Sequence, residues 1–560
     1  MRPVREGRLG LAPFLAELEA RLLALSPDEL RARLLADAER LPPGERTAFL
    51  ALFGDEQPAE RALEGKEALL ADIAGFVEDL RSGAYVEGWG WDPDLHEERA
   101  FGDESWVGEL DALFHAAGDA FLADGLELAR EAYGRLLRAL LLEGDGLFFC
   151  GPEPAEEMLD TDVAEAKARY LRAVYETTPL AERAARLAEE VAALGYVGGG
   201  VRLRRLAEAR RGDLPDLEAF LPGWIELLRG AEGLGPEERE LLIEAVALKR
   251  GSDGLGELAR ERREPELFLA WIDALLAEDR LEDAAAACRE ALERLESLGE
   301  GRARIAEHLA RIAARQGDAP GRLEGRRAAW RASPSTERLL ELVESAAALG
   351  LVEEVLAAES DRIEEGAACD ARQACGLLLL ARRVEPALTL LETAAPLGWS
   401  DRRHPGPVVV PYLLLAGTGS PPPDGTLLAE QLAAVDRPAS RYLESPEESP
   451  EPRLAVLLAS RLAERPVAEA ERERLLAVAQ AAVEKRVAAV VGAKYRGAYE
   501  RVARLVIACA EALALGTGAS DGAAFVAEIR SRYPRHYAFR AELDGATRAS
   551  PLLPAPPRKR

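Results

Sequence analysis

The sequence predicts an all-α fold, an elongated α-solenoid built from antiparallel helix pairs. Apolar residues recur at i, i+3, i+4 and i+7 in short blocks, and Gly or Pro falls between the blocks, which is the pattern of amphipathic helices. Aromatic residues make up only 6% of the chain while Ala and Leu are abundant, so helices are favoured over strands. Blocks of this kind spread over 560 residues are typical of stacked helical repeats.

The clearest apolar stripes predict individual helices. They fall at residues 126–140, 268–275, 281–292 and 502–513. Ala284, Cys288 and Ala291 have the spacing of the small residues in the second helix of a tetratricopeptide repeat, where two helices approach closely. The Gly of the first helix and the closing Pro of that repeat are missing. The predicted repeats are therefore tetratricopeptide-like but degenerate.

Composition along the chain divides it into six parts. They are an N-terminal helical segment (1–83), a Trp-rich acidic loop (84–108), a helical-repeat array (109–400), a Pro/Gly-rich linker (401–425), a C-terminal helical segment (426–545) and a disordered tail (546–560). In the first part, Ser26, Pro27 and Glu29 form a capping box with Pro at the first helical position, which predicts that a helix begins there.

The charge and hydropathy of the chain exclude several classes of function. Its net charge of −28 disfavours nonspecific binding to nucleic acid or anionic membranes, which depends on surplus Lys and Arg. No apolar run approaches the ~18–20 residues of a membrane span. The first residues lack the apolar core of a secretion signal. We therefore expect a cytoplasmic protein.

The loop 84–108 is the sharpest candidate for a functional site, because it holds three of the seven tryptophans, Trp89, Trp91 and Trp106. Its acidic and imidazole groups are Asp92, Asp94, His96, Glu97, Glu98, Asp103 and Glu104. Such groups can bind a hard cation, or do acid–base chemistry in a pocket walled by indole rings. Alternatively the loop binds a partner.

The simplest interpretation of this loop is structural. The tryptophans then anchor a Gly-rich connection to neighbouring helices, while the acidic groups face water or pair with Arg99. On this interpretation Trp89 and Trp106 are packed anchors, whereas Asp92, Asp94 and His96 are solvated. We therefore predict no metal site in the loop.

Two basic clusters stand out against the acidic background. They consist of Arg202, Arg204, Arg205, Arg210 and Arg211, and of Arg530, Arg532, Arg535, His536 and Arg540. Arginines in clusters recognise phosphates or acidic peptides, but on helical repeats they more often pair with Glu on a neighbouring helix. We expect pairing for most of them.

Catalytic and cofactor motifs are missing from the sequence. The five cysteines are widely scattered, and three of them lie in helical stripes, where Cys acts as a small apolar residue. Cys369 and Cys375 do not have a zinc-ligand spacing. No HExxH, Gly-x-Ser-x-Gly or phosphate-loop motif is present. We expect no catalytic residue, no metal and no cofactor.

Three stretches resemble the helical part of bacterial proteins that often carry a SWIM zinc finger. They are LSPDELRARLLADAERLPP, GAYVEGWGWDPDLHEERAFGDESWVGELDALFHAAGDAFL, and KYRGAYERVARLVIACAEAL followed by FVAEIRSRYPRHYAFRAELD. The resemblance implies a tetratricopeptide-like helical array. The Cys-x-Cys and Cys-x-His pairs of the zinc finger are absent here, so neither the zinc module nor its DNA-binding role carries over.

Taken together, these features predict a non-enzymatic scaffold for protein–protein interactions, because helical arrays leave a long concave surface for a ligand. The candidate partner-binding residues are Trp89, Trp91, Trp106, Arg202, Arg205, Arg532 and Arg535. One alternative is an accessory subunit of a nucleic-acid-acting system, suggested by the SWIM resemblance. A second alternative is an enzyme or metal site at the 84–108 loop.

Overall fold

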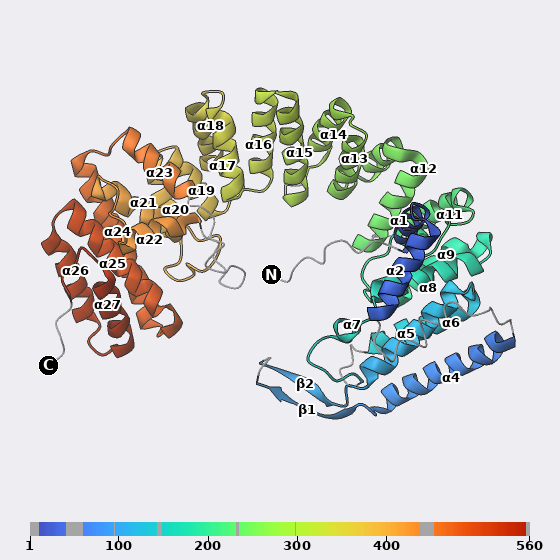
Figure 1. Ribbon diagram of the computed structural model, residues 1–560. Coiled ribbons are helices and arrows are strands. Elements are labelled where there is room, and N and C mark those ends of the chain that lie inside the picture. Colours follow the sequence, from blue (N-terminus) through green and yellow to red (C-terminus); the bar gives the residue numbers. More distant parts are fainter. Residues whose placement is uncertain are drawn as a thin grey trace. The chain divides into compact units, whose positions relative to one another are not determined.

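The computed structural model describes residues 11–40, 60–93, 96–142, 148–230, 235–296, 298–436 and 453–555 (Figure 1). The chain forms two compact units, Met1–Leu258 and Ala259–Arg560. In the described residues all regular structure except one two-stranded hairpin is helical, which confirms the predicted all-α class. None of the described helices has the length and apolar character needed to cross a membrane.

The first unit is built around helix α8. Its elements are α1 (Leu11–Leu23), α2 (Pro27–Arg40), α4 (Glu60–Ser82), β1 (Val86–Asp92), β2 (Glu97–Gly102), α5 (Trp106–Leu122), α6 (Leu126–Leu140), α7 (Ala155–Met158), α8 (Val163–Thr177), α9 (Leu180–Leu194), α10 (Leu203–Glu208), α11 (Leu217–Gly230) and α12 (Pro236–Arg262). Helix α8 contacts α5, α6, α9 and α10. The predicted capping box begins α2: the amide of Ser26 donates to Glu29, and the amide of Glu29 donates to Ser26.

The second unit begins as an ordered row of helices. Its elements are α13 (Pro265–Ala277), α14 (Leu281–Arg294), α15 (Glu300–Gln316), α16 (Ala319–Ala332), α17 (Thr336–Ala347), α18 (Val352–Glu364), α19 (Ala371–Leu380), α20 (Val384–Thr393), α21 (Gly406–Thr418), α22 (Leu427–Ala433), η2 (Ala434–Asp436), α23 (Arg453–Glu464), α24 (Glu469–Gly492), η4 (Arg496–Ala498), α25 (Tyr499–Gly516), α26 (Ala519–Arg532) and α27 (Tyr537–Ala549). From α13 to α20 each helix packs against the next, as in a helical-repeat array (Figure 1).

Small residues stand where helices of this row meet, as the repeat pattern predicts. Ala284, Cys288 and Ala291 are all fully buried on α14. Helices α15 and α16 approach closely at Gly325, where an added Cβ would lie 2.6 Å from the amide nitrogen of Ala310. Close backbone approach of this kind leaves no room for a larger side chain.

The linker predicted at 401–425 is corrected by helix α21. Its residues from Val408 to Thr418 are all buried, and α21 contacts α19, α22, α24 and α25. Because α21 is covered on every side, its sequence lacks the polar positions of an amphipathic helix and has no helical stripe. Its Pro residues lie at the start of the helix and at Pro411 inside it, so the prolines of this segment do not indicate a linker.

The predicted disordered tail 546–560 is also corrected in part. Helix α27 continues to Ala549, and the hydroxyl of Ser550 donates to Glu511 at 2.6 Å. Leu553 is buried against the core of the second unit. Residues 556–560 lie outside the described part of the chain. The division of the two units at 258/259 falls inside the range predicted as one array, 109–400.

Candidate functional site

The predicted loop 84–108 is a β-hairpin followed by the start of helix α5. Strands β1 and β2 are antiparallel, with Trp89 opposite Ala100 and Trp91 opposite Glu98. The chain turns after Asp92, whose carbonyl accepts from the amide of His96 at 2.9 Å. Alternation along a strand places Trp89, Trp91 and Glu98 on one face of the hairpin. The Trp-Gly-Trp alternation is itself a strand signal, which the glycines weaken.

The base of the hairpin is fixed to the helices by buried groups. Trp106 is 0% exposed, and its Nε1 donates to the carbonyl of Cys150 at 2.9 Å. The thiol of Cys150 donates to the carbonyl oxygens of Asp103 at 3.1 Å and Tyr85 at 3.2 Å. The hydroxyl of Tyr85 donates to Glu109 at 2.8 Å, and burial and this carboxylate raise its pKa. The hairpin is thus anchored at one end.

Beyond that base, the two remaining tryptophans are exposed. Trp89 and Trp91 are 57% and 59% exposed, so the expectation that Trp89 is a packed anchor is wrong. Trp106 is the anchor, and its complete burial removes it from the candidate partner-binding residues. Sequence alone could not separate the three rings, because the anchoring ring is the one at the start of a helix rather than in a strand.

The opposite face of the hairpin carries an ion pair. The Nε of Arg99 donates to Asp92 at 2.7 Å, and its guanidinium lies 4.4 Å from the ring centroid of Phe101. Asp92 is buried, which corrects the expectation that it is solvated, whereas the predicted pairing of the loop carboxylates with Arg99 is confirmed for this residue. His96 is exposed, as predicted, and Asp94 lies outside the described residues.

Among the described residues, no three His, Cys, Asp or Glu side chains gather in a way that could hold a metal ion. The cysteine thiols of the described residues are not activated as nucleophiles either. Burial raises the pKa of Cys288, Cys369 and Cys375 to about 12 each. A thiol with such a pKa stays protonated near neutral pH and is a poor nucleophile.

The first basic cluster is largely paired with carboxylates, as expected. Arg202 pairs with Glu240, Arg204 with Glu208, Arg210 with Asp124 and Arg211 with Glu19. Arg205 is exposed on α10 and makes no ion pair with the described residues. The candidate Arg202 is therefore engaged within the protein, and Arg205 is available to a ligand.

In the second basic cluster, two of the arginines are also paired with carboxylates. Arg530 pairs with Asp544, and Arg532 pairs with Glu528 at 2.6 Å and with Glu484 at 2.9 Å. Arg535 is exposed and has no ion pair in the described part of the chain. Of the two candidates here, Arg532 joins α26 to α24 and only Arg535 is available.

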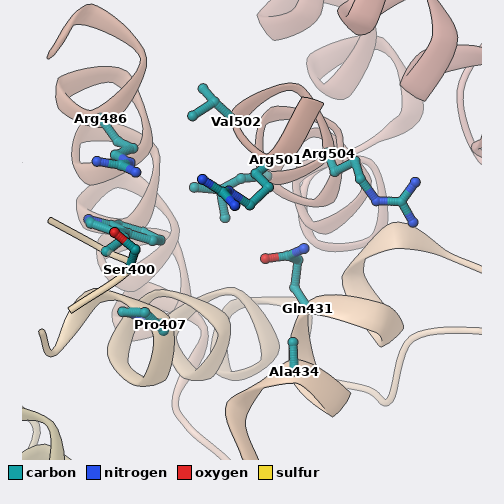
Figure 2. Close-up of a pocket in the computed structure, with 10 residues that line it drawn as sticks. Ser400, Pro407, Gln431, Ala434, Arg486, Arg501, Val502 and Arg504 are labelled. Carbon is teal, nitrogen blue, oxygen red and sulfur yellow. The ribbon is translucent and has the colours of Figure 1, made fainter. Parts of the chain in front are cut away.

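Sequence reasoning missed a third group of arginines that line a cavity in the second unit. Figure 2 shows this cavity, to which α24 contributes Arg486 and α25 contributes Arg501 and Arg504. The three residues do not form a run in the sequence, and the surrounding helices bring them together. A spatial cluster of this kind has no signature in a single sequence.

Comparisons with known proteins add little to this geometry. No family model matches the chain, and no curated protein matches it. The chain is similar to a solved structure described as a circular tandem repeat protein with novel repeat topology and enhanced subunit contact surfaces. The match has 15% sequence identity, covers 87% of this chain and 96% of the other, and has a TM-score of 0.15. Because that TM-score is so low, the likeness carries no argument.

Proposed function

We propose that this chain is a non-enzymatic scaffold for protein–protein interactions, and that the β1–β2 hairpin is one of its docking elements. The observation that carries the proposal is the pair Trp89 and Trp91, which share one face and are both more than half exposed. Large aromatic side chains supply much of the binding energy of protein interfaces when a partner covers them. Desolvation raises the pKa of all five cysteine thiols, which supports the non-enzymatic part of the proposal.

The anchored base gives the hairpin a fixed position on its unit. Trp106 packs edge-on against Phe149, with ring centroids 4.8 Å apart, and bonds to the carbonyl of Cys150. A docking element that is already ordered loses less conformational entropy when a partner binds. The two exposed rings are therefore presented on a preformed strand.

The charge around the rings favours a partner segment rich in Arg or Lys. Glu98 lies directly opposite Trp91, and its carboxylate is 3.5 Å from the indole nitrogen of Trp89. A guanidinium or ammonium group can pair with this carboxylate while it stacks on an indole face. The net charge of −28 attracts such a segment from a distance.

Fluorescence titration with a defined peptide tests the proposal. The probe is a short Arg/Gly peptide, added to the full chain at about 0.15 M salt so that long-range attraction is screened. We expect Trp89→Ala and Trp91→Ala each to weaken binding by about two- to fivefold, as cation–π contacts at exposed sites contribute ~0.5–1 kcal/mol. Tyr196→Ala is the matched control, because Tyr196 is an exposed aromatic residue elsewhere in the same unit.

The two tryptophan variants keep the net charge, so simple attraction to an acidic protein is unchanged in them. Equal affinity of the wild type and of the double variant Trp89→Ala/Trp91→Ala for the peptide would refute the hairpin as a docking element.

The location in the cytoplasm, the SWIM relationship and the nucleic-acid alternative remain predictions from the sequence.

A further inference from the structure

Among the described residues, a cavity of about 270 Å³ in the second unit is lined by cationic and neutral side chains only. Three of its ten lining residues are Arg486, Arg501 and Arg504, and the other seven carry no charge. The lining comes from the turn before α21 and from α21, α22, η2, α24 and α25 (Figure 2). This composition is unusual for a chain with 99 acidic and 71 basic residues.

Arg486 is a buried arginine without a carboxylate partner among the described residues. It is 8% exposed, and its Nη1 donates to the carbonyl of Pro396 at 2.9 Å. Its guanidinium carbon lies 5.5 Å from the ring centroid of Trp399, which makes a cation–π contact. Burial, together with the charge of Arg501, lowers the pKa of Arg486 to about 10. The guanidinium is still cationic near neutral pH.

Arg501 faces Arg486 across the cavity. In Figure 2 the guanidinium of Arg501 points toward the side of the cavity where Arg486 lies, and the side chain of Gln431 lies below Arg501. Arg501 is exposed and makes no ion pair with the described residues. Two facing cations repel each other, and an anion between them interacts favourably with both. The arrangement is therefore suited to a negative ligand.

Arg504 shows by contrast what a structural arginine of this cavity looks like. It pairs with Glu430 on α22, and in Figure 2 its guanidinium points away from the other two. Most of the arginines in the two basic clusters of the sequence are paired in the same way. Arg486 and Arg501 are exceptions that share one cavity.

We propose that this cavity binds the phosphate group of a small molecule between Arg486 and Arg501. Guanidinium groups bind phosphate oxygens through paired N–H donors, and a phosphate dianion matches two such cations. The side-chain amide of Gln431 lies at the rim of the same cavity. The cavity volume suits a small molecule, and the site is separate from the hairpin of the proposed scaffold function.

Titration calorimetry on the full chain tests the proposal with two probes, inorganic phosphate and glycerol 3-phosphate, at an ionic strength held constant with sodium chloride. We expect saturable binding of one phosphate group per chain. Tighter binding of glycerol 3-phosphate identifies a phosphorylated organic ligand, and equal or weaker binding identifies the free ion. The absence of saturable binding of both probes overturns the proposal.

Single substitutions locate the binding. Arg501→Gln removes an exposed, unpaired guanidinium and is expected to weaken phosphate binding by about tenfold or more, since hydrogen bonds to charged groups are lost. Arg486→Gln should also weaken phosphate binding. Because this buried residue donates to the carbonyl of Pro396, the fold of the variant protein is checked by circular dichroism. If Arg486→Gln does not fold, Arg501→Gln decides the matter alone.

A matched control removes one positive charge outside the cavity. Arg535→Gln affects an exposed arginine of the loop between α26 and α27. This variant is expected to keep phosphate affinity within about twofold of the wild type, because long-range charge is screened by salt. If Arg535→Gln weakened binding as much as Arg501→Gln, the assigned site would be overturned.

Discussion

The Nε of Arg99 donates to the carboxylate of Asp92 at 2.7 Å across the two strands of the hairpin. Both side chains are largely buried, and the same guanidinium covers the ring of Phe101. This ion pair lies on the face opposite Trp89 and Trp91. One face of the hairpin therefore holds the strands together, while the other leaves its aromatic rings in solvent.

Asp92→Asn is expected to loosen the hairpin. The change leaves Arg99 without its carboxylate, and the loss is about 1–3 kcal/mol for a largely buried group. Because the expected effect is a local opening of the hairpin, amide hydrogen exchange of residues 86–92 is the suitable measurement. Glu104→Gln, at an exposed carboxylate of the same segment, is the control. Exchange at the wild-type rate in Asp92→Asn would contradict a stabilising role for the pair.

Replacing the tryptophans one at a time should separate anchoring from exposure. Trp106→Ala removes a completely buried ring and is expected to lower the free energy of unfolding by ~3–5 kcal/mol. Trp89→Ala and Trp91→Ala remove exposed rings and should change it by less than about 0.5 kcal/mol. Urea unfolding followed by circular dichroism measures all three. A large loss in Trp89→Ala would show that this ring is packed in solution.

Glu359 is a buried carboxylate on α18 that binds arginines of two helices. It pairs with Arg331 at 2.6 Å and Arg327 at 3.5 Å on α16, and with Arg362 at 3.1 Å on its own helix. Glu359→Gln leaves these cations without their counter-charge and is expected to cost ~3–5 kcal/mol of stability. Glu354→Gln, at an exposed position of the same helix, should have almost no effect on urea unfolding.

His404 should make stability depend on pH. Its Nδ1 accepts from the amide of Gly406 at 3.0 Å, and its Nε2 lies 2.7 Å from the carbonyl of Ala395, so the neutral ring holds the start of α21. Burial lowers the pKa of His404 below its ordinary value of 6.5. The stabilising contribution is therefore present above pH ~6.5 and is lost as pH falls through the lower pKa of the folded state.

The variant His404→Asn tests this contribution. The Asn side chain can still accept from the amide of Gly406 but does not titrate, so the melting temperature of the variant should fall less than that of the wild type below pH ~6.5. Parallel loss of melting temperature in the two proteins would assign the acid sensitivity to other groups. Burial lowers the pKa of His308 as well, and the comparison removes that shared contribution.

Helices with one buried face could be predicted from the sequence, and elements without such a face could not. Helix α6 buries Ala129, Tyr133 and Leu136 at helical spacing, so its pattern of apolar residues predicts both its existence and its packing. Helix α21 is buried all round and has no such pattern. The hairpin escaped prediction because Gly88 and Gly90 interrupt the residue types that favour strands.

The candidate sites were predictable only where sequence neighbours act together. Trp89 and Trp91 are two residues apart, and their common face follows from the strand. Arg486 lies over the ring of Trp399, and the described helices α21, α22 and α23 come between the two residues in the sequence. The packing of those helices decides which arginines pair with a carboxylate. The clustering of charges along the sequence does not predict this pairing.

The burial of α21 has a consequence for how the protein folds while it is being synthesised. The helix is covered chiefly by α24 and α25, and both follow it in the chain, beginning at Glu469 and Tyr499. When residues 406–418 leave the ribosome, α25 has therefore not yet emerged to cover them. Until it does, this apolar segment is open to aggregation.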